Sequence, residues 1–213
     1  MSSVVGLMGK KLGMTHVFDQ DGNSVPVTVV QAGPCPIVQV KTPGSDGYSA
    51  LQVGFESIPN HKLSKPKQGH FKKSGLKQPT RHLTEFRLED SSSYEVGSEL
   101  TVNQFEAGVS IDVQGQSIGK GFMGTVKRHG FSRGPMSHGS KSHRIPGSIG
   151  AGTTPGRVYK GHKMAGRKVG TAKVKNLEVV QVDQERNIIL IKGSTPGANG
   201  AILKITPNLK VGG

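Results

Sequence analysis

The stretch LEVVQVDQERNIILIKG, residues 177–193, contains two short runs rich in β-branched and aliphatic residues, and QERN lies between them. Short runs of this kind, separated by a few polar residues, are typical of a β-hairpin. The stretch therefore predicts two antiparallel strands, at 177–183 and 187–193, joined by a turn.

Similar runs occur through most of the chain. DQDGN, AGPCP and PGSDG separate several of them and are typical of turns. Many short strands with turns between them favour a small barrel or sandwich, so the predicted fold class is mainly β. The further strands are expected at residues 4–8, 14–18, 25–32, 36–42, 48–55, 84–88, 98–102, 109–113 and 201–206. Short helices are expected near 66–75 and within 121–131, and neither has a sustained apolar stripe.

The charge is distributed unevenly along the chain. The 213 residues include 28 Lys and Arg against 14 Asp and Glu, a formal net charge of +14. No acid occurs between Asp112 and Glu178, and a second acid-free stretch runs from Ser57 to Thr84. The other parts carry all 14 acids and only eight basic residues. The chain is thus a mildly acidic body with two basic segments, and an acidic polymer is the expected partner.

Residues 132–173 have Gly or Pro every few positions and almost no periodic apolar content. Alone in water such a segment buries too little apolar surface to offset the entropy of ordering it. Simple disorder is one interpretation. The scattered Ile, Val, Tyr, Phe and Met side chains favour another, in which the segment becomes ordered against a partner.

The residue types in the basic segments suit RNA. Arginine makes forked hydrogen bonds to phosphates, glycine lets the backbone approach closely, and no carboxylate repels phosphate. No helix-turn-helix, basic zipper or zinc-finger spacing is present, so folded RNA is favoured over duplex DNA. The predicted RNA-binding residues of the long segment are Lys120, Lys127, Arg128, His129, Arg133, His138, Lys141, His143, Arg144, Arg157, Lys160, His162, Lys163, Arg167 and Lys168. Those of the second segment are Lys62, Lys65, Lys67, Lys72, Lys73, Lys77 and Arg81, with a solvated basic face as the alternative.

No motif indicates catalysis, a cofactor or a metal. GKGFMG at 119–124 spells GxGxxG, but the acid that should follow about 20 residues later is missing. His138 and His143 have no carboxylate or thiolate nearby to complete a metal site. The single cysteine, Cys35, is expected to be a buried structural thiol. We therefore expect no catalytic residues, no metal, no cofactor and no small-molecule substrate.

The sequence predicts a cytosolic protein, with an organelle left open. One cysteine permits no intramolecular disulfide, which fits a reducing compartment. No apolar run reaches the roughly 18 residues of a membrane span, and the N-terminus lacks a secretory signal.

Several long motifs resemble the family of the third protein of the large ribosomal subunit, in its bacterial form. They are GLMGKKLGMTHVF (6–18), KPKQGHFKKSG (65–75), GKGFMGTVKRHGF (119–131), SHRIPGSIG (142–150) and TPGRVYKGHKMAG (154–166). The resemblance also includes TEFRL (84–88) and DQERNIILIKGSTPG (183–197), and it extends over essentially the whole chain in one order.

The resemblance implies a β-barrel of the kind found in translation factors and a long loop that enters the rRNA. The implied loop tip, near the peptidyl transferase centre, is Ser148, Ile149, Gly150, Ala151, Gly152, Thr153 and Thr154. Bacterial relatives can carry a methylated glutamine directly after PGSIG, and Ala151 excludes that modification here. The implied partners are large-subunit rRNA and neighbouring ribosomal proteins, and the implied roles are structural and in subunit assembly.

We accordingly expect a body of residues 1–115 and 174–213, with a basic insertion at about 57–84, and an rRNA-penetrating loop of residues 116–173. Two alternatives stay open. An RNA-processing or RNA-modifying enzyme would turn over rRNA, whereas a nucleoid or chromatin protein would bind duplex DNA and folded rRNA equally.

Overall fold

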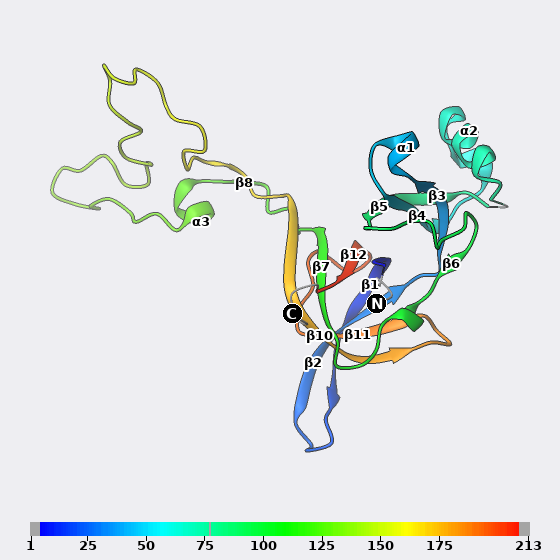
Figure 1. Ribbon diagram of the computed structural model, residues 1–213. Coiled ribbons are helices and arrows are strands. Elements are labelled where there is room, and N and C mark those ends of the chain that lie inside the picture. The colour runs from blue at the N-terminus through cyan, green and yellow to red at the C-terminus, as the bar shows by residue number, and fades with distance from the viewer. Residues whose placement is uncertain (1–4, 77, 209–213) are drawn as a thin grey trace. The chain divides into compact units, whose positions relative to one another are not determined.

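The computed structural model describes residues 5–76 and 78–208, which form two compact units. The first unit comprises the chain up to Gln116 and again from Thr171 onward, and the second comprises Ser117–Gly170. Figure 1 shows the strands of the first unit and the largely irregular path of the second.

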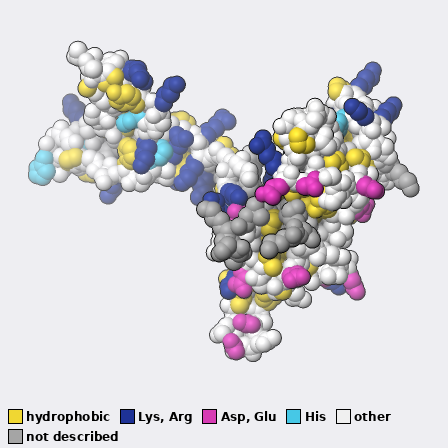
Figure 2. Space-filling model, in the orientation of Figure 1, with side chains coloured by type: hydrophobic (Ala, Val, Ile, Leu, Met, Phe, Trp, Pro, Cys, Tyr) yellow, Lys and Arg dark blue, Asp and Glu magenta, His cyan; other side chains and the backbone are white. Residues whose placement is uncertain are grey.

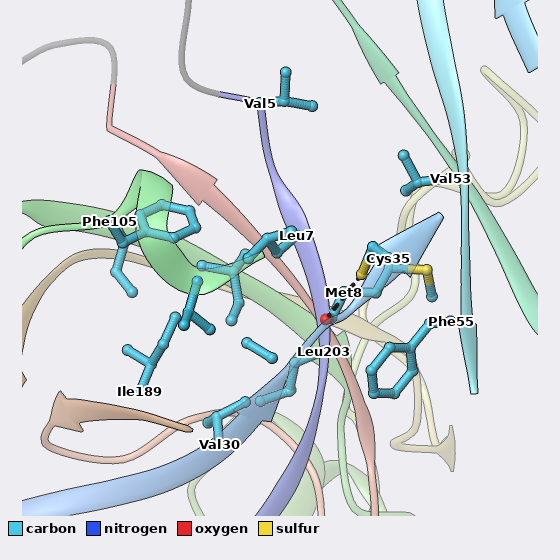
Figure 3. Close-up of a cluster of buried hydrophobic side chains, with 14 of the residues drawn as sticks. Val5, Leu7, Met8, Val30, Cys35, Val53, Phe55, Phe105, Ile189 and Leu203 are labelled. Atoms are coloured by element: carbon cyan, nitrogen blue, oxygen red, sulfur yellow. Dashed lines mark hydrogen bonds between the residues drawn. The ribbon is translucent and has the colours of Figure 1, made fainter. Parts of the chain in front are cut away.

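Six strands of the first unit form a closed antiparallel ring in the order β1-β12-β7-β10-β11-β2. Alternating side chains of these strands point inward, as the period of a β-strand requires. Leu7, Val30, Ile189 and Leu203 are almost completely buried inside the ring (Figure 3). The strands are β1 (Leu7–Phe18), β2 (Ser24–Ala32), β7 (Ser110–Gln116), β10 (Thr171–Asp183), β11 (Ile188–Lys192) and β12 (Ile202–Pro207).

A four-stranded sheet packs against this ring and shares its core. Its order is β5-β4-β3-β6, and its buried residues, such as Ile37, Leu51 and Phe86, belong to the same hydrophobic cluster as Leu7 and Ile205. The elements of this part are β3 (Cys35–Lys41), α1 (Pro43–Asp46), β4 (Ala50–Ser57), the 3-10 turn Asn60–Lys62, α2 (Lys65–Ser74), β5 (Thr80–Arg87), β6 (Glu99–Leu100) and the 3-10 turn Val102–Gln104.

The second unit has little regular structure. It contains the two-residue strands β8 (Phe122–Met123) and β9 (Gly166–Arg167), which pair with each other, and the short helix α3 (Thr125–His129). The rest of residues 117–170 forms turns and extended chain.

The expected mainly β fold is confirmed, as are the hairpin and both helices. Asp183 pairs with Ile188 across the predicted QERN turn. Helix α2 begins one residue before the predicted segment 66–75 and ends at Ser74, and helix α3 lies within the predicted segment 121–131. The expected turn PGSDG instead forms the single helical turn α1, which begins at Pro43.

Several strands extend beyond their predicted ranges, β1 and β10 the furthest. The runs at 4–8 and 14–18 belong to one strand, because β1 continues through the intervening GKKLG. Strand β10 begins at Thr171, because Thr171–Val174 pair with β7, so residues 171–173 lie in the ring and not in the predicted loop.

Cys35 is a buried structural thiol, as expected. Its Sγ donates a hydrogen bond to the Met8 carbonyl oxygen at 3.5 Å, drawn as a dashed line in Figure 3. Burial raises the pKa of this thiol to about 12, although the Met8 contact acts weakly in the opposite direction.

Among the described residues, no helix is long and apolar enough to cross a membrane.

Candidate nucleic-acid interface

The second unit has almost no hydrophobic core. Of residues 117–170, all of which the structure describes, only Met123 and Thr125 are buried. Many of its large apolar side chains face outward instead: Ile118, Phe122, Met136, Ile145, Ile149, Val158, Tyr159, Met164 and Val169. A unit of this size normally needs a core to fold alone, and exposed apolar side chains in this number are typical of a surface that contacts another molecule.

Backbone hydrogen bonds close the unit where it leaves the ring. The Ser117 N–H donates to the Gly170 carbonyl oxygen at 2.9 Å, and the Gly170 N–H donates to Ser117 Oγ at 3.2 Å. A few residues further on, Phe122 and Met123 of β8 pair with Arg167 and Gly166 of β9. The two ends of the segment are therefore held side by side, and the residues between them form a long loop.

Helix α3 is attached to the returning chain through Met164. Arg128 Nη1 donates to the Met164 carbonyl oxygen at 2.7 Å, and His129 Nε2 lies 3.0 Å from the same oxygen. Gly166 has a positive φ of 156°, and a Cβ there would lie 2.7 Å from Arg128 Nη1. Glycine at this position thus lets the guanidinium reach the backbone.

A second internal contact shapes the chain between residues 134 and 143. The Gly134 N–H donates to the His143 carbonyl oxygen at 2.9 Å, and His143 Nδ1 lies 2.9 Å from the Pro135 carbonyl oxygen. A Cβ at Gly134 would overlap the Ser142 carbonyl oxygen. The glycine-rich composition here allows two backbone segments to approach closely.

Three residues predicted to bind RNA thus have an internal role. Arg128, His129 and His143 are half-buried and bond to backbone carbonyl oxygens of their own unit. The other predicted residues of the long segment are exposed: Lys120, Lys127, Arg133, His138, Lys141, Arg144, Arg157, Lys160, His162, Lys163, Arg167 and Lys168.

The cations of the second unit are not neutralised within the protein. No residue of 117–170 takes part in an ion pair with any described residue. Figure 2 shows Lys, Arg and His side chains spread over this unit and no Asp or Glu. Unpaired cations at this density repel one another, so the surface is suited to binding an anionic polymer.

Exposed aromatic side chains lie among these cations. The Arg157 guanidinium carbon is 5.0 Å from the centre of the Tyr159 ring, and Tyr159 is 62% exposed. Phe122 is 76% exposed. Aromatic and guanidinium faces of this kind stack on unpaired bases. Neither aromatic residue was in the predicted set, although an aromatic beside Arg and Lys in GRVYK was the available signal.

The predicted loop tip is fully exposed. All seven residues from Ser148 to Thr154 are accessible, and none is charged. The Gly150 N–H donates to Ser148 Oγ at 3.4 Å, the one hydrogen bond to a side chain within this tip in the described structure. The tip therefore offers backbone groups and small side chains to a partner.

The second basic segment forms a surface on α2 and the turn before it. Lys62, Lys65, Lys67, Lys72 and Lys73 are exposed and have no acidic partner among the described residues. Arg81, on β5, lies 3.8 Å from Glu56 Oε2, so its charge is partly compensated. The predicted Lys77 lies outside the described residues.

No group of three or more His, Cys, Asp or Glu side chains is placed to hold a metal ion in residues 5–76 and 78–208.

Comparison with known proteins gives one consistent result. Residues 93–187 match the family model described as ribosomal protein L3. The chain is 57% identical over 210 residues to a protein of Synechococcus elongatus, with 98% of each chain covered. It is 58% identical over 209 residues to a protein of Thermosynechococcus vestitus, with 98% of each covered. It is 55% identical over 209 residues to one of Prochlorococcus marinus, covering 98% of this chain and 96% of the relative. All three relatives are named large ribosomal subunit protein uL3.

Proposed function

Because the chain belongs to the ribosomal protein L3 family, we propose that it is a structural constituent of the large ribosomal subunit that binds the rRNA of that subunit. Its partners are then large-subunit rRNA and neighbouring ribosomal proteins, and its place is the ribosome in the cytoplasm. The protein is then not an enzyme, because the relatives that it matches are named as ribosomal proteins.

The second unit is the segment that enters the rRNA in this proposal. The observation that carries it is an ordered, acid-free unit that exposes both its cations and its apolar side chains. Folded RNA supplies what such a unit lacks, because phosphates neutralise Lys and Arg while bases and riboses cover apolar and aromatic surface. The exposed residues from Lys120 to Lys168 make these contacts, and Ser148–Thr154 form the tip that approaches the peptidyl transferase centre.

The first unit is the part that docks on the rRNA surface. Its closed antiparallel ring supports a resemblance to the barrel of translation factors. The exposed lysines Lys62, Lys65, Lys67, Lys72 and Lys73 on and before α2 grip rRNA from this side, and the protein supports subunit assembly by holding rRNA segments together.

The test compares the full chain with a variant in which residues 118–169 are replaced by a short Gly-Ser linker. Ser117 and Gly170 are kept because hydrogen bonds between them join the two ends of the second unit. Replacing only 118–169 also leaves β7 and β10 complete. Binding to large-subunit rRNA is measured across a salt series. The variant should bind more weakly, with a salt slope shallower by about 0.7 to 0.9 for each phosphate that the protein no longer neutralises.

A second variant, with Lys65, Lys67, Lys72 and Lys73 changed to glutamine, separates the two basic segments. Circular dichroism and thermal unfolding check that the ring persists in both proteins. An unchanged slope in the linker variant would move rRNA recognition to the first unit. Equal binding of the full chain to duplex DNA and folded rRNA would contradict the ribosomal role.

A further inference from the structure

The end of the hairpin formed by β1 and β2 extends past the ring. Strand β1 pairs with β12 only from Leu7 to Lys10, and strand β2 pairs with β11 only from Val27 to Gln31. Between Leu12 and Val25 each strand has only the other as its neighbour in the described structure. We call residues 12–25 the arm; Figure 1 shows it at the turn between β1 and β2.

One face of the arm is apolar and uncovered. Met14 and Phe18 lie on the same face of β1 and are 51% and 71% exposed, and Leu12, at the register shift just before them, is 45% exposed. His16 lies between them on the same face, with its ring centre 5.6 Å from that of Phe18. A two-stranded ribbon is only marginally stable by itself, and a row of exposed apolar residues along a free edge promotes association.

The arm also differs in charge from the rest of this basic protein. It contains Asp19 and Asp21 and no Lys or Arg. Both carboxylates are exposed, and neither forms an ion pair with a described residue. Figure 2 shows acidic side chains at this end of the first unit.

We propose that the arm is a docking surface for a neighbouring protein of the large subunit that presents an apolar patch flanked by lysine or arginine. The inference rests on the proposed ribosomal function. The apolar face provides the area that the partner buries, and Asp19 and Asp21 pair with its cations at the rim.

The chemistry of the arm opposes other occupants. The phosphates of rRNA carry the same sign as Asp19 and Asp21, and the arm has no Lys or Arg to neutralise them. A second copy of the chain that placed its arm against this one would bring like carboxylates together. A basic protein surface matches both the apolar and the acidic part of the arm.

Carbodiimide coupling in purified large subunits tests the docking. The carboxylate adds to the carbodiimide and forms an activated ester. A lysine amine then attacks the carbonyl carbon of that ester, so that an amide forms and the urea leaves. Because the link has zero length, it forms only where the two groups are in contact. Mass spectrometry of the digest should find Asp19 or Asp21 joined to a lysine of another ribosomal protein, and D19N/D21N should abolish that link.

A second reaction adds glycine ethyl ester as a competing amine and compares subunits with the free chain. Coupling of the ester to Asp19 and Asp21 should fall at least several-fold in subunits. Glu185, an exposed carboxylate in the β10–β11 turn, reports reagent efficiency in the free chain.

If the ester couples equally to Asp19 and Asp21 in subunits and in the free chain, and no link to another protein is found, the docking proposal is wrong. The proposed ribosomal function would be unaffected by that result. A link to a second copy of this chain would overturn the docking in the same way. Absence of the chain from purified large subunits would overturn the proposed function together with the docking.

Discussion

Tyr159 is the residue that most directly tests stacking by the second unit. Its exposed ring lies against Arg157, and a base stacked on it adds about 1–3 kcal/mol to binding. Tyr159→Ala should therefore weaken binding to large-subunit rRNA by roughly 5-fold to 150-fold, whereas Tyr159→Phe should bind like the parent. Filter binding at fixed salt measures both. An alanine variant with parental affinity would remove Tyr159 from the interface.

Cys35 reports on the core of the first unit. Its thiol is fully buried, and burial raises its pKa to about 12, so it stays protonated and covered in the folded protein. A thiol reagent at pH 8 should react only after denaturant is added. The thiol ionises near pH 9 in the unfolded chain but only near pH 12 in the folded protein. Ionisation of Cys35 should therefore lower the free energy of unfolding as the pH rises from about 9 toward 12. Rapid labelling of the native protein would contradict a sealed core.

The nature of the candidate RNA-binding residues could be predicted from the sequence, but the role of each could not. Residue type and the absence of acids indicate which side chains are suited to phosphate. The hydrogen bonds of Arg128, His129 and His143 depend on where the Met164 and Pro135 carbonyl oxygens point, which composition does not reveal. Phe122 and Tyr159 are likewise exposed because the second unit has almost no core in which they could be buried.

At the scale of elements, Asp112 of β7 forms hydrogen bonds that stabilise a bulge in the neighbouring strand β10. The pairing of these strands shifts between Val174 and Leu177, and Asn176 has a positive φ of 59°. Asp112 Oδ1 accepts the Asn176 N–H at 3.0 Å, and Oδ2 lies 2.8 Å from Lys173 Nζ. The carboxylate thus stabilises the bulge within β10.

Asp112→Asn should lower the free energy of unfolding by about 1–3 kcal/mol, because a buried acceptor loses its charge. Burial opposes ionisation of Asp112, but Lys173 and the Asn176 N–H outweigh it and lower its pKa. The stabilisation is present above the usual pKa near 3.8 and is lost as the pH falls through the lower folded value. Urea unfolding at pH 7 and pH 3 should show a smaller difference at the lower pH; an equal difference would contradict the role of the charge.

Elements with strong local signals were predictable, and those that depend on distant contacts were not. The QERN hairpin and helix α2 follow from their own residues. The continuity of β1 through GKKLG comes from its pairing with β2, which joins Lys11 to Val30 and Gly13 to Val29. In the same stretch Lys11 Nζ donates to the Thr195 carbonyl oxygen at 3.0 Å and to the Gly197 carbonyl oxygen at 3.2 Å. Pairing with β7 likewise extends β10 back to Thr171.

At the scale of the whole molecule, the two units differ both in their acidic residues and in the size of their hydrophobic core. All 14 acids lie in the first unit, which contains the core, whereas the second unit contains none and has almost no core. The sequence therefore predicted the existence of a second part better than its conformation. The path of residues 117–170 includes close approaches at glycines: Gly134 lies against the Ser142 carbonyl oxygen and Gly166 against the Arg128 guanidinium.

The central claim is that rRNA covers the second unit. Trypsin cleaves after Lys and Arg, and ten of the eleven such residues in 117–170 are exposed. The free chain should be cut rapidly within Lys120–Lys168, and the same sites should be protected in the assembled large subunit. Equal cleavage of these sites in the free and the assembled protein would contradict the claim.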